Sequence, residues 1–202
     1  MDLTDQYYTI DKPSAEVLFK EKGSKFFGYA FPLQNEDDVK SHIEDLKKMH
    51  HSARHWCYAY QLGTETITYR ANDDGEPTHS AGQPIYGQIQ SFNLTNVLIV
   101  VVRYFGGTKL GVGGLITAYK TCAKMAIESS RIISRSIDEC FVLNFKYKDM
   151  NKVMRIIKEK NIRIANQKME LDCSLEIHVR KSEAEAMSKL FEQLYGVSVK
   201  KL

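Results

Sequence analysis

The sequence predicts an α+β protein built from two domains, residues 1–135 and residues 136–202. Its length of 202 residues exceeds the roughly 150 residues that are typical of one domain. Runs rich in β-branched and aromatic residues alternate with segments of helical apolar periodicity along the whole chain. Apolar residues make up 43% and charged residues 26%, which is ordinary for a globular protein and excludes disordered and collagen-like architectures.

The first domain is predicted to begin with a β-hairpin and a capped helix. Residues 17–20 and 26–31 have strand character, and the turn formers around Gly23 separate them. Asn35 is an expected N-cap, because three acids follow it and lysines and histidines gather about a dozen residues later, as the helix dipole favours.

The rest of the first domain is predicted to alternate strands with loops and to end in a long helix. The run NVLIVVVR is continuously apolar, which is typical of a strand buried on both faces. The segment NDDGEPTHSAGQP gathers turn-forming residues and is predicted to be a loop. The expected elements are strands at 55–62 and 66–71, a short helix after Pro84, a strand at 96–103, a glycine-rich loop at 106–114 and a helix to about residue 133.

The second domain is predicted to have the order β-α-β-β-α-β, which is the ferredoxin-like pattern. Residues 138–147 are strand-like, and the next apolar residues repeat at helical spacing. Residues 173–180 alternate strictly between apolar and polar side chains, as in a strand with one buried face. Ser182 and Glu185 have the spacing of a capping box at the start of a second helix, and Gly196 is expected to end that helix.

Charge and cysteine usage restrict the class of function. A net charge of +3 is too small to imply nucleic-acid binding by itself. Residues 36–76 are mainly acidic, whereas Glu128 is the single acid within residues 77–135, so the first domain is polarised and could orient an anionic partner. The chain shows no membrane span and no export signal, and we expect a cytoplasmic protein with reduced thiols. The four cysteines lack metal-ligand spacing and are Cys57, Cys122, Cys140 and Cys173.

The strongest local motif is the glycine-rich loop between a buried strand and a long helix. Glycines allow backbone amides to approach a ligand, and a helix start adds unpaired donors and partial positive charge. The motif differs from a P-loop and from the dinucleotide fingerprint, because Val112 and Ile116 stand where those templates need other residues. The alternative is a tight turn with close helix–strand packing. The candidate anion- or partner-binding residues are Arg103, Gly106, Gly107, Lys109, Gly111, Gly113 and Gly114.

Two further motifs supply candidate functional residues. His55 and Cys57 share one face of a predicted strand, where an imidazole could activate the thiol, although core residues are the simpler interpretation. Carboxylates in the segment DDGE could bind a cation, structure a binding loop or only form a turn. We assign no catalytic residue, no metal and no cofactor. The candidate functional surface comprises His55, Cys57, Asp73, Asp74, Glu76 and His79.

Taken together, these motifs resemble the IMPACT/YigZ family. The resemblance rests on the segments RHWCYAY, DDGEP, AGQP and VVRYFGGTKLGVGGL, and on KGSKF near the start of the chain. Thr108 and Lys109 fill a pair that is often apolar in the family. The resemblance implies a first domain similar to the second domain of ribosomal protein S-five, and a ferredoxin-like second domain similar to domain V of elongation factor G. It also implies translational control among eukaryotic members, and ribosome or RNA association among bacterial ones.

We weigh three functions for the chain. The first is a non-enzymatic, translation-associated regulatory protein that binds the ribosome, RNA or a translation factor. The alternative is an enzyme that acts on a small phosphorylated or carboxylated substrate, with the glycine-rich loop as its anion site. A third is a protein-interaction module, with the aromatic side chains of Trp56, Tyr58 and Tyr60 as its interface. The oligomeric state is left open.

Overall fold

A computed structural model describes residues 5–202, which form two compact units. Tyr7–Arg135 make up the first unit. Ser136–Leu202 make up the second, together with Asp5 and Gln6. Residues 1–4, part of the segment in which we expect no export signal, lie outside the described residues.

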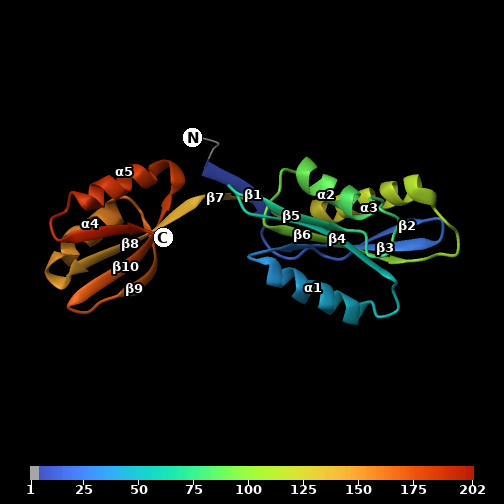
Figure 1. Cartoon of the computed structure of the whole chain (residues 1–202), viewed down its shortest axis with the longest axis horizontal. Coiled ribbons are helices and arrows are strands. Elements are labelled where there is room, and N and C mark those ends of the chain that lie inside the picture. Colours follow the sequence, from blue (N-terminus) through green and yellow to red (C-terminus); the bar gives the residue numbers. More distant parts are fainter. Residues whose placement is uncertain (1–4) are drawn as a thin grey trace. The chain divides into compact units, whose positions relative to one another are not determined.

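The first unit is built on a five-stranded antiparallel sheet with the strand order β2-β3-β6-β4-β5 (Figure 1). The central strand β6 is apolar along almost its whole length and is buried on both faces, as its sequence predicts. The hairpin predicted around Gly23 is present as β2 and β3. The strands are β2 (Val17–Glu21), β3 (Ser24–Pro32), β4 (His55–Leu62), β5 (Thr68–Asn72) and β6 (Val97–Tyr104).

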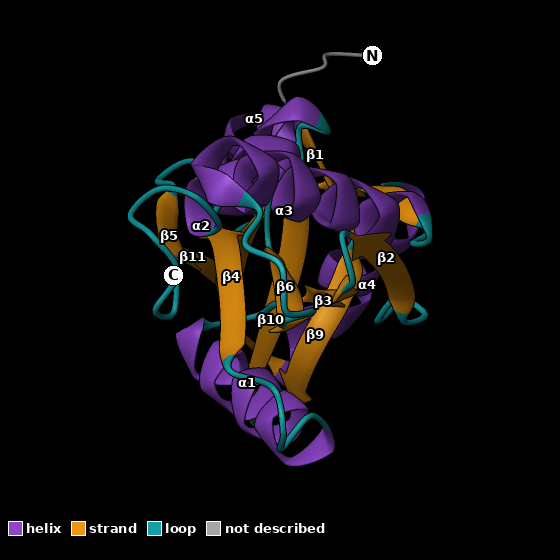
Figure 2. Cartoon of the chain, turned by 90° about the vertical axis from the view of Figure 1, so that its right-hand side faces the viewer, coloured by secondary structure: helices purple, strands orange, loops and turns teal. Residues whose placement is uncertain are grey.

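Helices cover both faces of this sheet, with α1 on one side and α2 and α3 on the other (Figure 2). Alternate residues of β6 contribute to the two cores: Ile99 packs with α2 and α3, and Val100 packs with α1. No helix within residues 5–202 is long and apolar enough to cross a membrane. The helices are α1 (Glu36–Met49), α2 (Gly82–Ser91) and α3 (Gly111–Glu128).

The predicted cap of α1 is confirmed. The Asn35 side chain accepts hydrogen bonds from the backbone amides of Asp37 and Asp38, and the Asp38 carboxylate accepts one from the Asn35 amide. This reciprocal capping box satisfies amides that would otherwise lack partners at the helix start.

Two predicted boundaries in the first unit are wrong. Helix α3 ends at Glu128 rather than near residue 133, because the hydroxyls of Ser129 and Ser130 both donate to the carbonyl of Ala126 and compete with the helical pattern. The residues that follow form strand β7 (Ile132–Ser136), which pairs with β1 (Gln6–Ile10) in a two-stranded sheet. Helix α2 begins two residues before Pro84, since proline is tolerated in the first turn of a helix.

The second unit has the element order β-α-β-β-α-β and an antiparallel sheet of order β11-β8-β10-β9. Helices α4 and α5 pack against one face of the sheet in a separate apolar core. A short 3-10 helix, Tyr147–Asp149, precedes α4. The elements are β8 (Asp138–Lys146), α4 (Met150–Glu159), β9 (Arg163–Lys168), β10 (Asp172–Arg180), α5 (Lys181–Glu192) and β11 (Val197–Lys201).

The predicted capping box of the last helix is wrong. The N-cap of α5 is Arg180, two residues before the expected Ser182, and no side chain of the cap residue bonds to the helix start. The backbone amide of Ser182 instead donates to the carboxylate of Asp5 at 2.9 Å. A residue 177 positions away in the chain therefore supplies the acceptor that the local spacing of Ser182 and Glu185 predicts.

We expect Gly106→Ala to destabilise the first unit. A Cβ atom on Gly106 would lie 1.9 Å from the backbone carbon of Gly23, so the two loops would have to separate. The free energy of unfolding, measured by urea titration, should fall by about 2 kcal/mol, as for other overpacked sites. The control is Gly87→Ala inside α2, where a Cβ meets no atom within 4 Å; it should raise stability by up to about 1 kcal/mol. Equal effects of the two variants would contradict this packing.

Candidate functional site

The candidate residues of the first unit gather around Arg103, near the end of the central strand. Sheet register places Arg103 between Phe26 of β3 and His55 of β4. Its Nη1 donates to Oε1 of Glu76 at 2.6 Å, and the two side chains are only 6% and 4% exposed. The guanidinium therefore faces the protein interior, and its charge is neutralised by a carboxylate from the loop that follows β5.

Glu76 also connects Arg103 to helix α3 and strand β4. Its Oε1 accepts a hydrogen bond from the hydroxyl of Tyr119 at 2.8 Å, and the Cys57 thiol donates to that hydroxyl oxygen at 3.3 Å. Burial raises the pKa of the Cys57 thiol and, more strongly, the pKa of the Tyr119 phenol. Both groups stay protonated at neutral pH, so the arrangement does not supply a thiolate nucleophile.

The Asp73 carboxylate folds the loop between β5 and α2. Its Oδ1 accepts hydrogen bonds from the amides of Ala81 and Gly82 at 2.9 and 2.8 Å, and its Oδ2 accepts one from the amide of His79 at 2.9 Å. Asp73 thus supplies the acceptor at the start of α2, where the cap residue Ala81 makes no side-chain hydrogen bond. These bonds occupy the carboxylate and give it a structural role.

Asp74 joins the same loop to strand β4. Its Oδ2 accepts from the amide of Trp56 at 2.7 Å, and its carbonyl accepts from Nδ1 of His55 at 2.9 Å. Among the hydrogen bonds of the described residues, none joins His55 to Cys57, whose thiol lies 3.0 Å from the carbonyl of Asp73. The two side chains share a face of the strand, as expected, but they do not form a nucleophile–base pair.

A serine of the hairpin turn links this buried cluster to the glycine-rich loop. Ser24 Oγ accepts from Nη2 of Arg103 at 3.4 Å and from the amide of Gly106 at 3.2 Å. Gly23 and Gly106 are in backbone contact that a side chain on either would prevent. The turn between β2 and β3 and the glycine-rich loop after β6 therefore form one rigid end of the sheet.

Four exposed lysines surround this pair of loops, and we call them the lysine cluster. Lys20 and Lys25 lie directly opposite each other on β2 and β3, where like charges disfavour strand pairing. Within residues 5–202, none of the four makes an ion pair. The lysine cluster comprises Lys20, Lys22, Lys25 and Lys109.

The start of α3 leaves its first amides open. Its cap residue Leu110 offers no side-chain hydrogen bond, and its first turn contains no acidic residue. Gly111 and Gly113 are exposed, and a Cβ on either would meet no atom within 4 Å. Free amides and the positive end of the helix dipole therefore face open space beside Lys109.

The structure thus separates the sequence candidates into two groups. The first is a hydrogen-bonded cluster made by Arg103 and the predicted functional surface. The second is an exposed group formed by Lys109 and the glycines of the loop and helix start. Sequence reasoning missed Tyr119, Ser24 and the lysines of the hairpin. The KGSKF segment contains Lys22, Ser24 and Lys25, but not Lys20.

A second buried network lies on the α1 side of the sheet. His50, the C-cap of α1, is bracketed by two phenols: Nε2 lies 2.5 Å from the Tyr29 hydroxyl and Nδ1 lies 3.1 Å from the Tyr104 hydroxyl. Tyr29 donates to the Glu16 carboxylate, so Nε2 carries the proton that bonds to Tyr29, and Tyr104 donates to Nδ1. Burial lowers the pKa of His50, which keeps the ring neutral near pH 7. This network fixes Tyr104 directly before the glycine-rich loop.

Aromatic residues of β4 belong to the core on this side of the sheet. Tyr60 is buried, and Trp56 and Tyr58 pack against the same apolar cluster. The indole of Trp56 donates to the carbonyl of Leu46 in α1 at 3.4 Å. These contacts give the three aromatic side chains a packing role under α1.

Residues 22–127 match the family model described as the Impact N-terminal domain. The chain belongs to the IMPACT family. The match contains the buried Arg103 cluster, three members of the lysine cluster and the start of α3. The resemblance that the motifs indicate is therefore confirmed over the region where the candidate residues lie.

Relatives extend the similarity over most of the chain. The IMPACT family member YvyE of Bacillus subtilis is 29% identical over 188 residues, covering 93% of this chain and 86% of its own. An IMPACT family member of Haemophilus influenzae is 31% identical over 183 residues, covering 87% of each chain. The crystal structure of a hypothetical protein is similar with a TM-score of 0.71 and 23% identity, covering 98% of this chain and 97% of the other, so the two share a fold.

We expect Glu76→Gln to destabilise the protein by about 3 kcal/mol, because it leaves the buried Arg103 charge without a counter-charge. Urea unfolding should report this loss. In the control Glu128→Gln, which breaks an exposed pair with Lys124, stability should change by less than about 0.5 kcal/mol. Arg103→Gln combined with Glu76→Gln should recover part of the loss. Additive effects of the two substitutions would contradict the pairing.

We expect Cys140 to be the one thiol that iodoacetamide modifies quickly in the folded protein. Cys57, Cys122 and Cys173 are buried, and burial raises the pKa of Cys122 to about 12. Mass spectrometry should show one adduct in the native protein and four after unfolding in urea. Cys140→Ser should abolish the native adduct, and rapid modification of Cys57 would contradict its buried, protonated state.

Proposed function

We propose that this protein is a non-enzymatic, translation-associated regulatory protein. It binds the ribosome, RNA or a translation factor through the lysine cluster and the open start of α3. The observation that carries the proposal is the group of four exposed lysines that surround two contacting loops and make no ion pair with any other described residue. Lysines in such a group attract phosphate groups, and binding then releases counterions. Membership of the IMPACT family supports a role in translation, as the resemblance in the sequence implies.

The structure of the Arg103 cluster favours binding over catalysis. An enzyme would need a free acid, base or nucleophile beside the anion site. Asp73 and Glu76 are held by the hydrogen bonds described above, and the Cys57 thiol is kept protonated. The anion-binding set therefore consists of Lys109 and the open glycines, joined by the hairpin lysines, with Arg103 as the residue that holds the loops in place.

We also infer a separate fold comparison for each of the domains 1–135 and 136–202. The first is proposed to resemble the second domain of ribosomal protein S-five. The second is proposed to be ferredoxin-like and similar to domain V of elongation factor G, and its β-α-β-β-α-β order supports that comparison. Both are fold-level analogies that support contact with ribosomal components in the cytoplasm.

Charge reversal in the lysine cluster should weaken ribosome association. Lys25→Glu with Lys109→Glu should weaken co-sedimentation with ribosomes at least tenfold at low salt, because two phosphate contacts become repulsive. The control Lys40→Glu with Lys48→Glu makes the same change in net charge on α1, where both lysines pair with acids, and should have little effect. Circular dichroism should show that both variants are folded.

The salt dependence provides a second measurement of the same contact. Replacing Lys25 and Lys109 by glutamine should reduce the slope of log affinity against log salt by roughly one to two. Absence of association by the folded wild-type protein at both low and moderate salt would overturn the proposal. Turnover of a nucleotide, or thermal stabilisation by one, would favour the enzyme alternative instead.

A further inference from the structure

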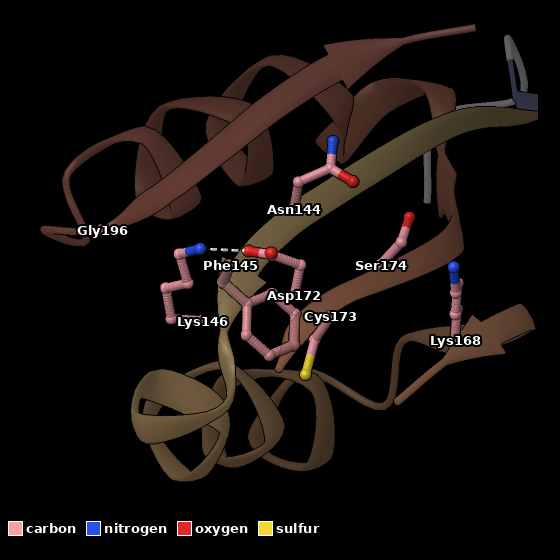
Figure 3. Close-up of a pocket in the computed structure, with 8 residues that line it drawn as sticks. All are labelled: Asn144, Phe145, Lys146, Lys168, Asp172, Cys173, Ser174 and Gly196. Atoms are coloured by element: carbon pink, nitrogen blue, oxygen red, sulfur yellow. Dashed lines mark ion pairs between the residues drawn. The ribbon is translucent and has the colours of Figure 1, made fainter. Parts of the chain in front are cut away.

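The second unit leaves one face of its sheet uncovered by its own helices. Along β10, the buried residues face α4 and α5, and the polar residues between them face the opposite way. Figure 3 shows this alternation: Phe145 and Cys173 point to one side of the sheet, whereas Asn144 and Ser174 point to the other. The open face is therefore polar, and a hollow lies at each end of the sheet.

The hollow drawn in Figure 3 has about 410 Å³ and carries lysines whose charges are compensated. Lys146 pairs with Asp172 at 2.5 Å, and Lys168 pairs with Glu170 at 3.3 Å. Because each cation already has a partner, an added anion would gain little at this end of the sheet.

The hollow at the opposite end has about 420 Å³, and its three cations outnumber its two carboxylates. Lys160, Arg163 and Arg180 line it, and within residues 5–202 none of them forms an ion pair. His178 lies between the two arginines, because sheet register places it directly opposite Arg163 and it is two residues from Arg180 on the same face of β10. Two carboxylates, Asp138 and Glu183, complete the polar lining.

Backbone geometry fixes this convergence of charge. Asn161 has a positive φ of 51° just after α4, and the amide of Ile162 donates to the carbonyl of Ile157 at 2.9 Å. This left-handed helix end reverses the chain so that Lys160 and Arg163 stand on both sides of one tight turn. Arg180 is the last residue of the neighbouring strand β10, and this end of β10 lies beside the start of β9. Three segments thus present like charges to one hollow, and their mutual repulsion would be relieved by an anion.

We propose that this hollow binds a ribose-phosphate group, with the cations holding the phosphate and Asp138 and Glu183 accepting hydrogen bonds from sugar hydroxyls. A volume of about 420 Å³ lies within the 300–1,000 Å³ range of ligand sites and exceeds the needs of a bare phosphate. No phenylalanine, tyrosine or tryptophan is among the residues that line the hollow, so we assign the site to sugar and phosphate rather than to a base. Arginine suits phosphate because its guanidinium makes paired hydrogen bonds.

The site belongs to the second unit and the lysine cluster to the first, and the site does not require the function proposed above. Ribose phosphate could come from a free sugar phosphate or from the backbone of single-stranded RNA. Both sources present the same ribose and phosphate groups to the site. The choice of probe in the binding experiment therefore distinguishes them.

Cys140 offers a reporter for the occupied site. Its thiol lies 3.4 Å from Nδ1 of His178, directly across the strand pair β8–β10. Burial raises the pKa of the Cys140 thiol, and the nearby charge of Arg163 opposes that rise. A ligand that neutralises Arg163 and covers His178 should slow the reaction of this thiol with iodoacetamide.

The first experiment measures the affinity of the full chain for ribose 5-phosphate and for a ten-residue oligouridylate by calorimetry. Arg163→Gln with Arg180→Gln should weaken binding of at least one probe tenfold or more. The matched control, Lys146→Gln with Lys168→Gln, removes the same charge at the other hollow and should change affinity less than twofold. Ligand should protect Cys140 from iodoacetamide in the wild type and in the control, but not in the arginine variant.

The outcomes separate the sources and the two proposals. Binding of ribose 5-phosphate identifies a free sugar phosphate, whereas binding of oligouridylate alone, and not of the matching DNA, identifies RNA. Loss of RNA binding with Lys25→Glu and Lys109→Glu, but not with the arginine variant, would overturn this site and leave the proposed function standing. No binding of either probe at millimolar concentration would also overturn the site.

Replacing a carboxylate of the hollow tests the proposed contact with sugar hydroxyls without removing any cation. Glu183→Gln should strengthen binding of inorganic phosphate severalfold, because a repulsive carboxylate is lost, and should weaken preference for ribose 5-phosphate over phosphate. Unchanged affinity for both probes would contradict the role given to Glu183.

Discussion

The buried carboxylate of Glu76 holds together three segments of the first unit. It receives hydrogen bonds from Arg103 of β6 and from Tyr119 of α3, and it is itself part of the loop that follows β5. A charged pair with side chains 6% and 4% exposed is stable only when each partner is present, since either alone would be an uncompensated charge in a medium of low polarity. The positions of the surrounding loops depend on this pair.

That constraint extends from the core to the exposed loops. Arg103 also donates to Ser24, and Ser24 accepts from the amide of Gly106, so the guanidinium fixes the hairpin turn and the glycine-rich loop at once. On the other face of the sheet, His50 holds the Tyr104 hydroxyl. The loop is thus supported from both sides, and the lysine cluster is presented on a rigid frame. Rigid presentation lowers the entropy that would be lost when a partner binds.

The two units use cations in different ways. Among the described residues of the first unit, Arg103 is the only buried arginine, and it has a structural role inside the protein. The lysine cluster, in contrast, is exposed and makes no ion pair within those residues. In the second unit, one hollow has paired lysines, and the other has arginines that form no ion pair with another described residue. The number of basic residues is therefore a poor guide to a binding surface, because pairing decides which charges remain available to a ligand.

The sequence by itself determined the secondary structure wherever apolar periodicity and caps are strong, as in β6, α1 and β10, because these signals report local burial and local hydrogen bonding. It also indicated the family, through the short motifs around Arg103 and Asp73. Where a boundary depends on distant residues, as at Ser182 and Asp5, local spacing gave the wrong cap. Only the tertiary structure decided that Arg103 is neutralised by a residue 27 positions away and that Cys57 bonds to Tyr119 rather than to His55. The physical reason is that partner choice depends on sheet order and register, which bring together side chains that no sequence period relates.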